Sequence, residues 1–290
     1  MLELTLQQWL QRAALQLEQL AAIDPHISDV RLEARRLAGD LLDIAPTAMQ
    51  LKIPELLTSA ELQQLDAALL RRCHGEPLAY ITGRWWFWDL ELEVAPCTLI
   101  PRPDTELLVE QALELVLPPN AKVLDLGTGT GAIALSLAKA RPDWQVTAVD
   151  YSDEAVALAK RNCDRLGLNN CLVQQSDWFS ALTGQQFQLI ISNPPYIDAD
   201  DHNLQQGDVR FEPRSALVAP AHGLADLAII CAKAPQYLTE NGWLWLEHGY
   251  QQADAVQKLL LEAGFSAVCS RKDYAGQWRI SGGNWQATLR

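Results

Sequence analysis

The sequence lacks any uninterrupted apolar run of about 18 residues, the shortest stretch that reads as a membrane-spanning helix. Its first twenty residues, MLELTLQQWLQRAALQLEQL, also lack the basic start, the unbroken apolar stretch and the small-residue cleavage site of a secretory signal. The sequence therefore predicts neither membrane insertion nor secretion, and we expect a cytoplasmic protein.

Cysteine and histidine are scarce, with six and five residues among 290. No two cysteines form a Cys-x-x-Cys pair, and the closest two are eight positions apart. The histidines show no metal-ligand spacing. This pattern predicts free thiols in a reducing compartment and no metal site. The cysteines are Cys73, Cys97, Cys163, Cys171, Cys231 and Cys269.

Basic residues are outnumbered, because 23 Lys and Arg stand against 36 Asp and Glu and give a formal net charge of −13. Nucleic-acid binding gains affinity from clustered Lys and Arg, which release counterions. The composition therefore disfavours duplex DNA as a partner. Since 49% of the residues are hydrophobic, the chain can bury a core, and its length predicts about two domains.

Residues 1–73 predict a small helical bundle, which forms the first domain. Thr5 with Gln8 and Thr58 with Glu61 fit capping boxes, in which two side chains satisfy orphan main-chain donors at a helix start. Apolar residues at steps of three and four line one face of the first helix. These residues are Leu2, Leu6, Trp9, Leu10, Ala13, Leu17 and Leu20. Further helices are expected over 28–43 and 58–73.

Residues 74–105 predict a β-hairpin linker. Gly, Pro and aromatic residues replace the leucine periodicity here, and LELEV alternates as a half-buried strand does. Three of the ten tryptophans lie in the run WWFW at 85–88. This run could stack bases, but packing of the hairpin onto a neighbouring element is the favoured interpretation.

Residues 106–290 alternate between strands and helices, which predicts an α/β domain with a doubly wound, mostly parallel sheet. The last two strands follow each other through a glycine-containing turn, so they predict a hairpin and an antiparallel last strand, unlike a plain dehydrogenase domain. The expected strands are 122–127, 145–150, 171–176, 187–193, 242–248, 266–273 and 279–285. The expected helices are 131–140, 153–166, 224–240 and 251–263.

A glycine-rich turn follows the first of these strands, with the sequence DLGTGTGA at 125–132. Glycines let the main chain turn sharply and approach a ligand closely. Gly127, Gly129 and Ala132 also satisfy the dinucleotide fingerprint. Asp150, at the end of the next strand, can accept the ribose hydroxyls of any adenosine cofactor. The turn alone leaves NAD and S-adenosylmethionine both open.

Asp125 favours S-adenosylmethionine. A carboxylate beside the ligand's polar end suits a cationic amino-acid group and would repel a pyrophosphate. The residues of this region that we expect at the cofactor are Asp125, Gly127, Thr128, Gly129, Thr130, Gly131 and Asp150.

The sequence NPPY ends the fourth parallel strand, where ligands of such sheets bind. Pro194 and Pro195 stiffen the chain and leave carbonyl acceptors exposed, Asn193 adds a side-chain acceptor, and Tyr196 adds a flat wall with a polar tip. Two converging acceptors would hold an NH2 group, orient its nitrogen and stabilise developing positive charge. The motif predicts methyl transfer to a planar, weakly nucleophilic nitrogen, with Asn193, Pro194 and Tyr196 as the catalytic residues and no evident general base.

The ordered motifs resemble those of the HemK/PrmC-type protein-glutamine methyltransferases, which modify peptide-chain release factors. NPPY by itself is shared with adenine-directed nucleic-acid methyltransferases, but the full set is more specific and covers essentially the whole chain. The stretch PLAYITGRWWFW (77–88) is similar to their linker hairpin. The other shared stretches are IPRPDTE (100–106), DLGTGTGAIAL (125–135), SDWF (176–179), NPPY (193–196), VRFEPRSAL (209–217) and EHG (247–249).

The resemblance implies a Rossmann-like fold, S-adenosylmethionine as donor and S-adenosylhomocysteine as product. It places Gly127 to Gly131 around the methionine part of the donor and Asp150 at its ribose. Asp177 would border the adenine through its amine, and Trp178 through main-chain or ring contact. Asn193 to Tyr196 would bind the glutamine side chain of a Gly-Gly-Gln loop in class I release factors. The helical domain would recognise this protein substrate, and the enzyme is expected to be a monomer.

Three further stretches have less certain roles. Residues 102–106 and 211–214 either shape the pocket mouth or form structural salt bridges, and both interpretations stay open. His222, in PAHGLADL (220–227), stands where many relatives have an acidic residue, so we assign no role to the loop 218–226.

Three rival functions remain. A nucleic-acid exocyclic-amine methyltransferase would use the same NPPY chemistry but should carry a basic groove. An NAD-dependent oxidoreductase is supported only by the glycine turn. A binding module without catalysis would bind the donor and show no turnover.

Overall fold

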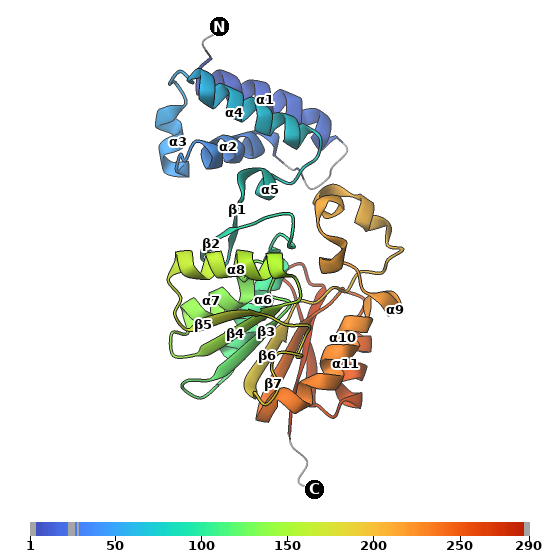
Figure 1. The fold of residues 1–290 in the computed structure, drawn as a ribbon. Coiled ribbons are helices and arrows are strands. Elements are labelled where there is room, and N and C mark those ends of the chain that lie inside the picture. Colours follow the sequence, from blue (N-terminus) through green and yellow to red (C-terminus); the bar gives the residue numbers. More distant parts are fainter. Residues whose placement is uncertain (1–3, 23–26, 28, 287–290) are drawn as a thin grey trace. The chain divides into compact units, whose positions relative to one another are not determined.

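The computed structural model describes residues 4–22, 27 and 29–286. Leu2, residue 28 and residues 287–290 fall in predicted segments and lie outside the described residues. The chain forms two compact units (Figure 1). One comprises Met1–Arg84 with His202–Phe211, and the other comprises Trp85–Asp201 with Glu212–Arg290. Among the described helices, none is both long and apolar enough to cross a membrane.

The first unit is helical, as predicted. Both capping boxes are present, at Thr5 with Gln8 and at Thr58 with Glu61. The predicted face of the first helix is buried from Leu6 to Leu20 and forms the core of the unit. The helices are α1 (Leu6–Ala21), α2 (Val30–Leu41), α3 (Pro46–Lys52), α4 (Ser59–Cys73) and α5 (Leu78–Thr82).

A segment from the second half of the sequence belongs to this helical unit. Residues 202–211 form two short 3-10 helices, η2 (His202–Gln205) and η3 (Gly207–Phe211). The buried Arg72 on α4 bridges Glu33 at 2.9 Å and Asp208 at 3.6 Å. A Cβ atom at Gly75, whose φ is +88°, would lie 1.8 Å from the Arg210 guanidinium, so a side chain there would displace the end of the Arg210 side chain.

Within the predicted linker 74–105, residues 84–93 form the predicted hairpin, from β1 (Arg84–Phe87) and β2 (Leu90–Glu93). The prediction was wrong for its first part, because Leu78–Thr82 is helix α5 and the helical unit extends to Arg84. Phe87 is buried in the core of the second unit, whereas Trp86 is 62% exposed. The Trp85 indole nitrogen donates to Pro101 O at 3.1 Å, and the Trp88 main-chain nitrogen donates to the Glu106 carboxylate at 2.8 Å. These contacts favour packing for three of the four aromatic residues and leave Trp86 at the surface.

The second unit contains a seven-stranded sheet in the order β5-β4-β3-β6-β7-β9-β8. Strands β3 to β7 are mutually parallel, and β9 pairs antiparallel with both β7 and β8, which confirms the predicted fold class. The last strand of the chain, β9, lies between β7 and β8, so β8 is the edge strand on that side of the sheet. The strands are β3 (Lys122–Leu126), β4 (Gln145–Asp150), β5 (Cys171–Gln175), β6 (Phe187–Ser192), β7 (Leu238–Glu247), β8 (Ser266–Lys272) and β9 (Trp278–Asn284).

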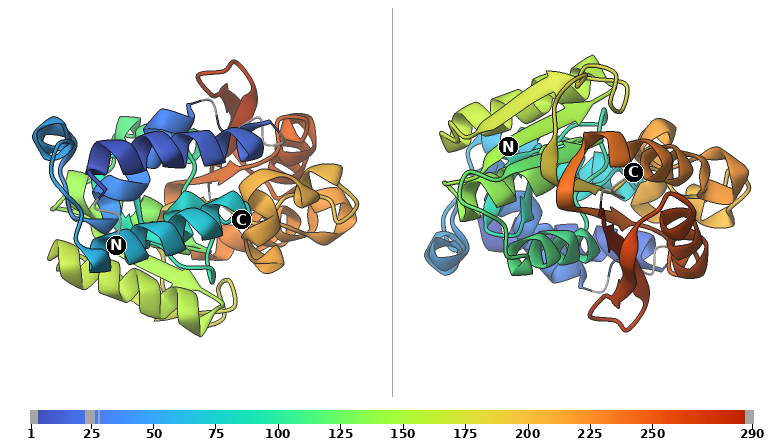
Figure 2. Two further views of the ribbon diagram at one scale, coloured as in Figure 1. Left: turned by 90° about the horizontal axis from the view of Figure 1, so that it is seen from above. Right: turned by 90° about the horizontal axis from the view of Figure 1, so that it is seen from below.

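Helices cover both faces of this sheet and bury separate cores (Figures 1 and 2). One core includes residues of α6 (Glu106–Glu114), α7 (Ala132–Ala140) and α8 (Asp153–Leu166). The other includes residues of α10 (Ala225–Lys233) and α11 (Ala253–Glu262). The shorter helices of this unit are η1 (Pro103–Thr105), η4 (Arg214–Ala216), α9 (Pro220–Gly223) and η5 (Ala234–Tyr237).

The helix predicted over 224–240 was too long. Helix α10 ends at Lys233, the 3-10 helix η5 follows with Pro235 in its first turn, and β7 already begins at Leu238. Pro235 has no N–H to continue an α-helical hydrogen-bond ladder. Leu238 instead pairs with Phe187 at the start of the neighbouring strand.

The strand order reverses at the centre of the sheet. Strand β3 is flanked by β4 on one side and β6 on the other, and Leu126 of β3 pairs with Ser192 of β6. Both strands therefore end at the same level, and the residues that follow them, Gly127 and Asn193, emerge side by side. This edge is the position at which ligands bind in open α/β sheets.

Candidate active site

The glycine loop runs from the end of β3 directly into α7. Gly127 and Gly131 have φ angles of +71° and +88°, which side chains disfavour. A Cβ atom at Gly131 would also approach the Leu135 Cδ1 atom to 2.8 Å. The main-chain nitrogens of Gly127 and Thr128 each donate to Val149 O at 2.9 Å, so the loop is fixed against β4.

Asp150, at the end of β4, holds the same loop from the side. Its Oδ2 atom accepts from the Gly129 nitrogen at 2.8 Å, and its Oδ1 atom accepts from the Ser152 nitrogen at 2.9 Å. Burial raises the pKa of the Asp150 carboxyl above its ordinary value. Each oxygen retains lone-pair capacity, so Asp150 can accept further hydrogen bonds from ligand hydroxyls.

Asp125 is completely buried beneath the loop. Its Oδ2 atom accepts from the Thr128 hydroxyl at 2.6 Å and from the Ala134 nitrogen at 3.3 Å. Its Oδ1 atom has no hydrogen-bond partner among the described residues. Burial raises the pKa of Asp125 to about 7. Asp125 thus supports the loop from below.

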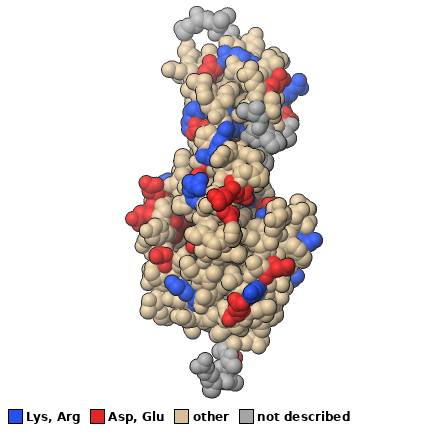
Figure 3. Space-filling view, turned by 90° about the vertical axis from the view of Figure 1, so that its right-hand side faces the viewer, with Lys and Arg blue, Asp and Glu red and all other residues tan. Residues whose placement is uncertain are grey.

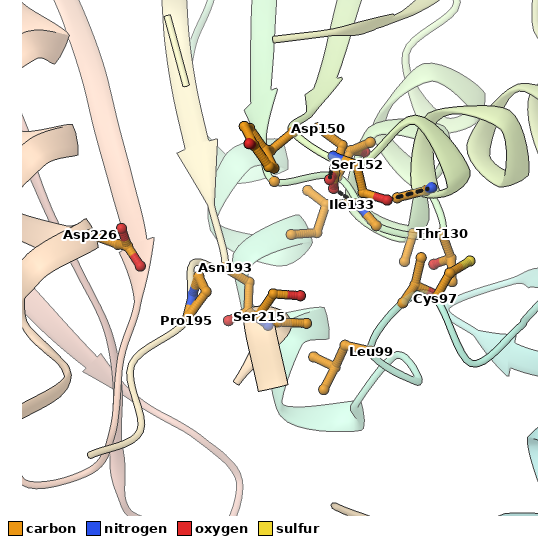
Figure 4. A pocket seen from close by; sticks show the side chains of 18 of the residues that line it. Cys97, Leu99, Thr130, Ile133, Asp150, Ser152, Asn193, Pro195, Ser215 and Asp226 are labelled. Atoms are coloured by element: carbon orange, nitrogen blue, oxygen red, sulfur yellow. Dashed lines mark hydrogen bonds between the residues drawn. The ribbon is translucent and has the colours of Figure 1, made fainter. Parts of the chain in front are cut away.

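A cavity of about 280 Å³ opens beside this loop (Figure 4). Its volume is near the lower bound of small-molecule sites, which enclose about 300–1,000 Å³. Four predicted site residues lie outside the lining of this cavity: Asp125, Gly131, Pro194 and Tyr196. The predicted residues that line it are Gly127, Thr128, Gly129, Thr130, Asp150, Asp177, Trp178, Asn193 and Pro195.

Part of the cavity wall is formed by residues that were not predicted from the sequence. Figure 4 shows Cys97 and Leu99 on one side of the cavity and Asp226, from α10, on the opposite side. Burial first and the charge of Asp177 second raise the pKa of Asp226. No local motif marks these residues, since they approach the cavity only through the fold. Thr105, in the stretch 102–106 that was expected either to shape the pocket mouth or to form salt bridges, and Ala132, of the glycine-rich turn, also line the cavity. The other unpredicted lining residues are Thr98, Pro101, Ile133, Tyr151, Ser152, Ala155, Ser176, Ser215 and Ala216.

Asn193 faces the cavity from the end of β6 (Figure 4). Its Nδ2 atom donates to the Thr105 hydroxyl at 3.1 Å. Tyr196 does not form a cavity wall; its hydroxyl donates to Glu247 Oε1 at 3.1 Å. Burial and the Glu247 charge raise the pKa of Tyr196, so its hydroxyl stays protonated. The NPPY segment therefore presents Asn193 and Pro195 to the cavity and anchors itself through Tyr196.

The main chain around Tyr196 is held from two helices. Gln252, before α11, donates through Nε2 to Tyr196 O at 3.0 Å and to His222 O at 3.1 Å. A Cβ atom at Gly223, at the end of α9, would lie 1.9 Å from Tyr196 O. His222 itself has a φ of +56° and interacts with Asp198 over 2.6 Å. The loop that carries His222 thus packs against the NPPY segment.

Residues 102–106 and 211–214, for which the sequence left two roles open, contain a structural ion pair. Glu212 is buried, pairs with the Arg102 guanidinium and accepts from the Ile100 nitrogen at 2.9 Å. Thr105 and Ser215 from the same part of the fold line the cavity. Salt bridging and shaping of the site therefore occur together here.

The six cysteines are free thiols. Within the described residues, no cluster of three or more His, Cys, Asp and Glu side chains could hold a metal ion.

The chain is similar in sequence and in fold to known proteins. Residues 8–83 match the model of the PrmC N-terminal domain, and residues 103–210 match that of the methyltransferase small domain. A release factor glutamine methyltransferase of Salmonella typhimurium is 56% identical over 79% of this chain and 83% of its own length. One from Vibrio cholerae is 45% identical over 98% of both chains. The chain belongs to the release factor glutamine methyltransferase family.

A solved structure extends the comparison to the fold. A methyltransferase from Pyrococcus furiosus has a TM-score of 0.53 at 19% identity, over 77% of this chain and 98% of its own. This similarity supports the methyltransferase-type sheet. In this chain, the glycine loop, Asp150 and the NPPY segment lie together at the order reversal of that sheet.

Proposed function

We propose that the chain transfers a methyl group from S-adenosylmethionine to the side-chain amide nitrogen of the glutamine in the Gly-Gly-Gln loop of class I release factors. One observation carries this proposal. Asn193, a side-chain acceptor suited to an amide NH2 group, lines the same cavity as Asp150 and the glycine loop. A donor bound by the loop and an acceptor bound by Asn193 would meet there.

The residues of the cavity fit the donor. Asp150 keeps lone pairs for ribose hydroxyls, and the carboxylates of Asp177 and Asp226 can accept from the adenine amine. The ring of Trp178 lies beside Gly127, 3.8 Å from the position of its missing Cβ atom. Beneath the loop, Asp125 favours a cationic amino-acid group by its charge. S-adenosylmethionine supplies a methyl carbon activated by a sulfonium.

The NPPY segment would bind and orient the glutamine. Asn193 Oδ1 and the Pro194 carbonyl are the acceptors for its NH2 group, and they stabilise positive charge that develops on the nitrogen. An amide nitrogen is a weak nucleophile because its lone pair is delocalised, so positioning must supply most of the rate enhancement; effective molarity can contribute up to about 7–11 kcal/mol. Tyr196, Gln252 and Gly223 hold the segment rigid from behind.

A protein substrate fits the charge of the molecule better than a nucleic acid does. The formal net charge is −13, and basic side chains are interspersed with acidic ones on the face shown in Figure 3. Such a surface gains little from counterion release. The helical unit, which matches the PrmC N-terminal domain, would recognise the release factor.

The test is transfer of labelled methyl groups from S-adenosylmethionine to a purified class I release factor. We expect label on the wild-type factor and none on a factor whose loop glutamine is replaced by alanine. Equal labelling of both factors would refute the glutamine assignment. Labelling of ribosomal RNA but of neither factor would support the nucleic-acid alternative, and binding of NADH without S-adenosylmethionine binding would overturn the proposal altogether.

A further inference from the structure

The two halves of the glycine loop are held by different parts of the fold. The first half, Gly127 to Gly129, is fixed to the end of β4 through Val149 O and Asp150 Oδ2. The second half contains Thr130, which is buried and lines the cavity. The main-chain oxygen of Thr130 accepts a hydrogen bond of 2.9 Å from Asn162 Nδ2, on helix α8. Asn162 thus fixes the second half of the loop, as β4 fixes the first.

The same amide also holds the linker hairpin. Asn162 Oδ1 accepts from the Glu93 nitrogen at 2.7 Å, and Asn162 Nδ2 donates to Glu93 O at 3.0 Å. Glu93 is the last residue of β2, so the amide pairs with its N–H and C=O groups as a neighbouring strand would. Arg165 Nη2 lies 3.5 Å from the same Oδ1 atom. Because Asn162 is completely buried, solvent does not compete with these hydrogen bonds.

The partners of the Asn162 amide fix its orientation. A main-chain nitrogen only donates and a main-chain oxygen only accepts. The Glu93 nitrogen therefore requires the oxygen of the amide, and the oxygens of Glu93 and Thr130 require its two N–H groups. Aspartate and leucine have nearly the same shape as asparagine, but neither has a side-chain donor. The three hydrogen bonds thus depend on an asparagine at this position.

The two segments that Asn162 contacts form one wall of the cavity. Residues 97–99 follow shortly after β2, and all three line the cavity. Figure 4 shows the labelled members of this stretch on the same side of the cavity as Thr130. The segments also approach each other directly, because a Cβ atom at Gly129 would lie 3.8 Å from Thr98 Cβ. Asn162 therefore connects the two pieces of this wall from behind.

We infer that Asn162 is a positioning residue for the methyl donor. By joining the second half of the glycine loop to the end of β2, it holds one wall of the cavity in the shape that binds S-adenosylmethionine. Asn162 does not itself line the cavity, and it lies outside every motif of the sequence resemblance. The inference rests on the proposed function, from which it takes the donor.

The expected effect is on donor affinity rather than on the transfer step. Without the Asn162 amide, Thr130 and Glu93 lose their hydrogen bonds, which favours other shapes of the loop. The apparent affinity for a ligand falls by the fraction of molecules that keeps the binding-competent shape. The NPPY segment is held separately, through Tyr196 and Gln252, so transfer from bound donor should change little.

Asn162→Asp and Asn162→Ala test this role by calorimetric titration with S-adenosylmethionine. Aspartate keeps an acceptor for the Glu93 nitrogen but has no donor for Thr130 O, and alanine has neither. We expect the dissociation constant of the donor to rise at least about 10-fold in both variants, and kcat at saturating donor to stay within about 3-fold of wild type. A fall in kcat with unchanged donor affinity would overturn the inference.

Asn170→Asp and Asn170→Ala are the matched controls. Asn170 Nδ2 also donates to main-chain oxygens, those of Ala138, Arg141 and Trp144 at 2.9, 3.2 and 3.2 Å, but none of these residues lines the cavity. The controls should therefore lose stability yet keep donor affinity within about 2-fold of wild type, since the loop keeps its shape. Circular dichroism checks that each variant is folded at the temperature of the titration.

Hydrogen exchange of the wild type gives a second test that needs no variant. S-adenosylhomocysteine should slow exchange of the Glu93 amide at least about 10-fold, because a ligand that stabilises the wall also protects its hydrogen bond to Asn162. The Lys122 amide is the control, since it donates to a side-chain amide oxygen, Gln188 Oε1, at the same 2.7 Å. Equal slowing at Glu93 and Lys122, or no slowing at Glu93, would overturn the link.

The outcomes separate this inference from the proposed function. If the wild type binds S-adenosylmethionine and labels the release factor, but the Asn162 variants bind the donor as the Asn170 variants do, the positioning role is refuted and the function stands. If the wild type binds no S-adenosylmethionine, the proposed function itself fails. If neither Asn162 variant folds, the exchange of the Glu93 amide in the wild type decides.

Discussion

The Gly129 main-chain nitrogen donates a hydrogen bond of 2.8 Å to the Asp150 carboxylate, which ties the glycine loop after β3 to the end of β4. The residue proposed to hold the donor's ribose therefore also fixes the loop that surrounds the donor's amino-acid part. Cofactor contact and loop shape depend on one side chain.

Asp150→Ala should weaken donor binding at least 10-fold, or about 1.4 kcal/mol, because it removes the ribose acceptor and releases Gly129. Calorimetric titration with S-adenosylmethionine measures this change. Asp143→Ala, an exposed carboxylate paired with Arg141, provides the control and should bind the donor as wild type does. Unchanged affinity in Asp150→Ala would show that the donor lies elsewhere.

Asn193→Ala should lower kcat at least about 100-fold while donor affinity stays within about 2-fold. Loss of one preorganised stabilising group at a reacting centre typically costs about 10²–10³ in rate. Label transfer to release factor and donor titration measure the two quantities on the same preparation. Retained turnover would contradict the role of Asn193 as the amide acceptor, and Asn169→Ala, at an exposed turn, controls for loss of an asparagine.

Gly223→Ala should impair turnover by displacing the NPPY segment, since the new Cβ atom would lie 1.9 Å from Tyr196 O. Gly184→Ala is a matched control, because both glycines have a φ of +79° but nothing lies within 4 Å of a Cβ atom at Gly184. Each variant should lose about 1–2 kcal/mol of stability from the left-handed backbone. Only Gly223→Ala should lose more stability than this and also have a lower kcat. Equal kcat values in the two variants would contradict the contact with Tyr196.

Asp125→Asn should change how the stability of the ligand-free chain depends on pH. The folded-state pKa of Asp125 is raised to about 7 from an ordinary 3.8, so the folded chain holds a proton that the unfolded chain has released between these values. The wild type should therefore lose stability as the pH rises from about 4 to 7. Asparagine does not titrate and should relieve this loss, by an amount on the order of 2–4 kcal/mol.

Thermal unfolding of wild type and Asp125→Asn at pH 5 and pH 8 checks this expectation. The stability of Asp125→Asn relative to wild type should be larger at pH 8 than at pH 5. Asp143→Asn is the control at a fully exposed position, where the neighbouring Arg141 lowers the pKa of the carboxyl instead. An advantage of Asp125→Asn that is the same at both pH values would contradict the burial of an ionisable Asp125.

Local patterns were sufficient to predict most of the fold. The apolar face of α1, the two capping boxes and the short apolar strands are periodic signals that adjacent residues carry by themselves. The predicted end of α10 was wrong because the start of β7 is decided by the pairing of Leu238 with Phe187, which is a contact between distant parts of the chain. Helix α6 was not predicted, since it follows directly on the proline-rich IPRPDTE stretch.

The site was predictable only where its residues follow the ends of strands. Gly127 follows β3, Asp150 ends β4 and Asn193 follows β6. Parallel strands bring such ends together at one edge of the sheet. Thr105 stands in the recognised stretch IPRPDTE, but no spacing in the sequence indicates that its hydroxyl accepts a hydrogen bond from Asn193. Asp125 was expected at the ligand, and its burial beneath the loop depends on the packing of α7.

The grouping of residues 202–211 with the helical unit has a practical consequence for dissecting this enzyme. The polypeptide passes between the two units three times, after Arg84, Asp201 and Phe211. A single cut at the linker would leave the amino-terminal fragment without Asp208, a partner of its buried Arg72, and would leave that decapeptide on the other fragment. Neither half can be obtained intact by truncation alone, so separate expression requires grafting the decapeptide back onto the amino-terminal piece.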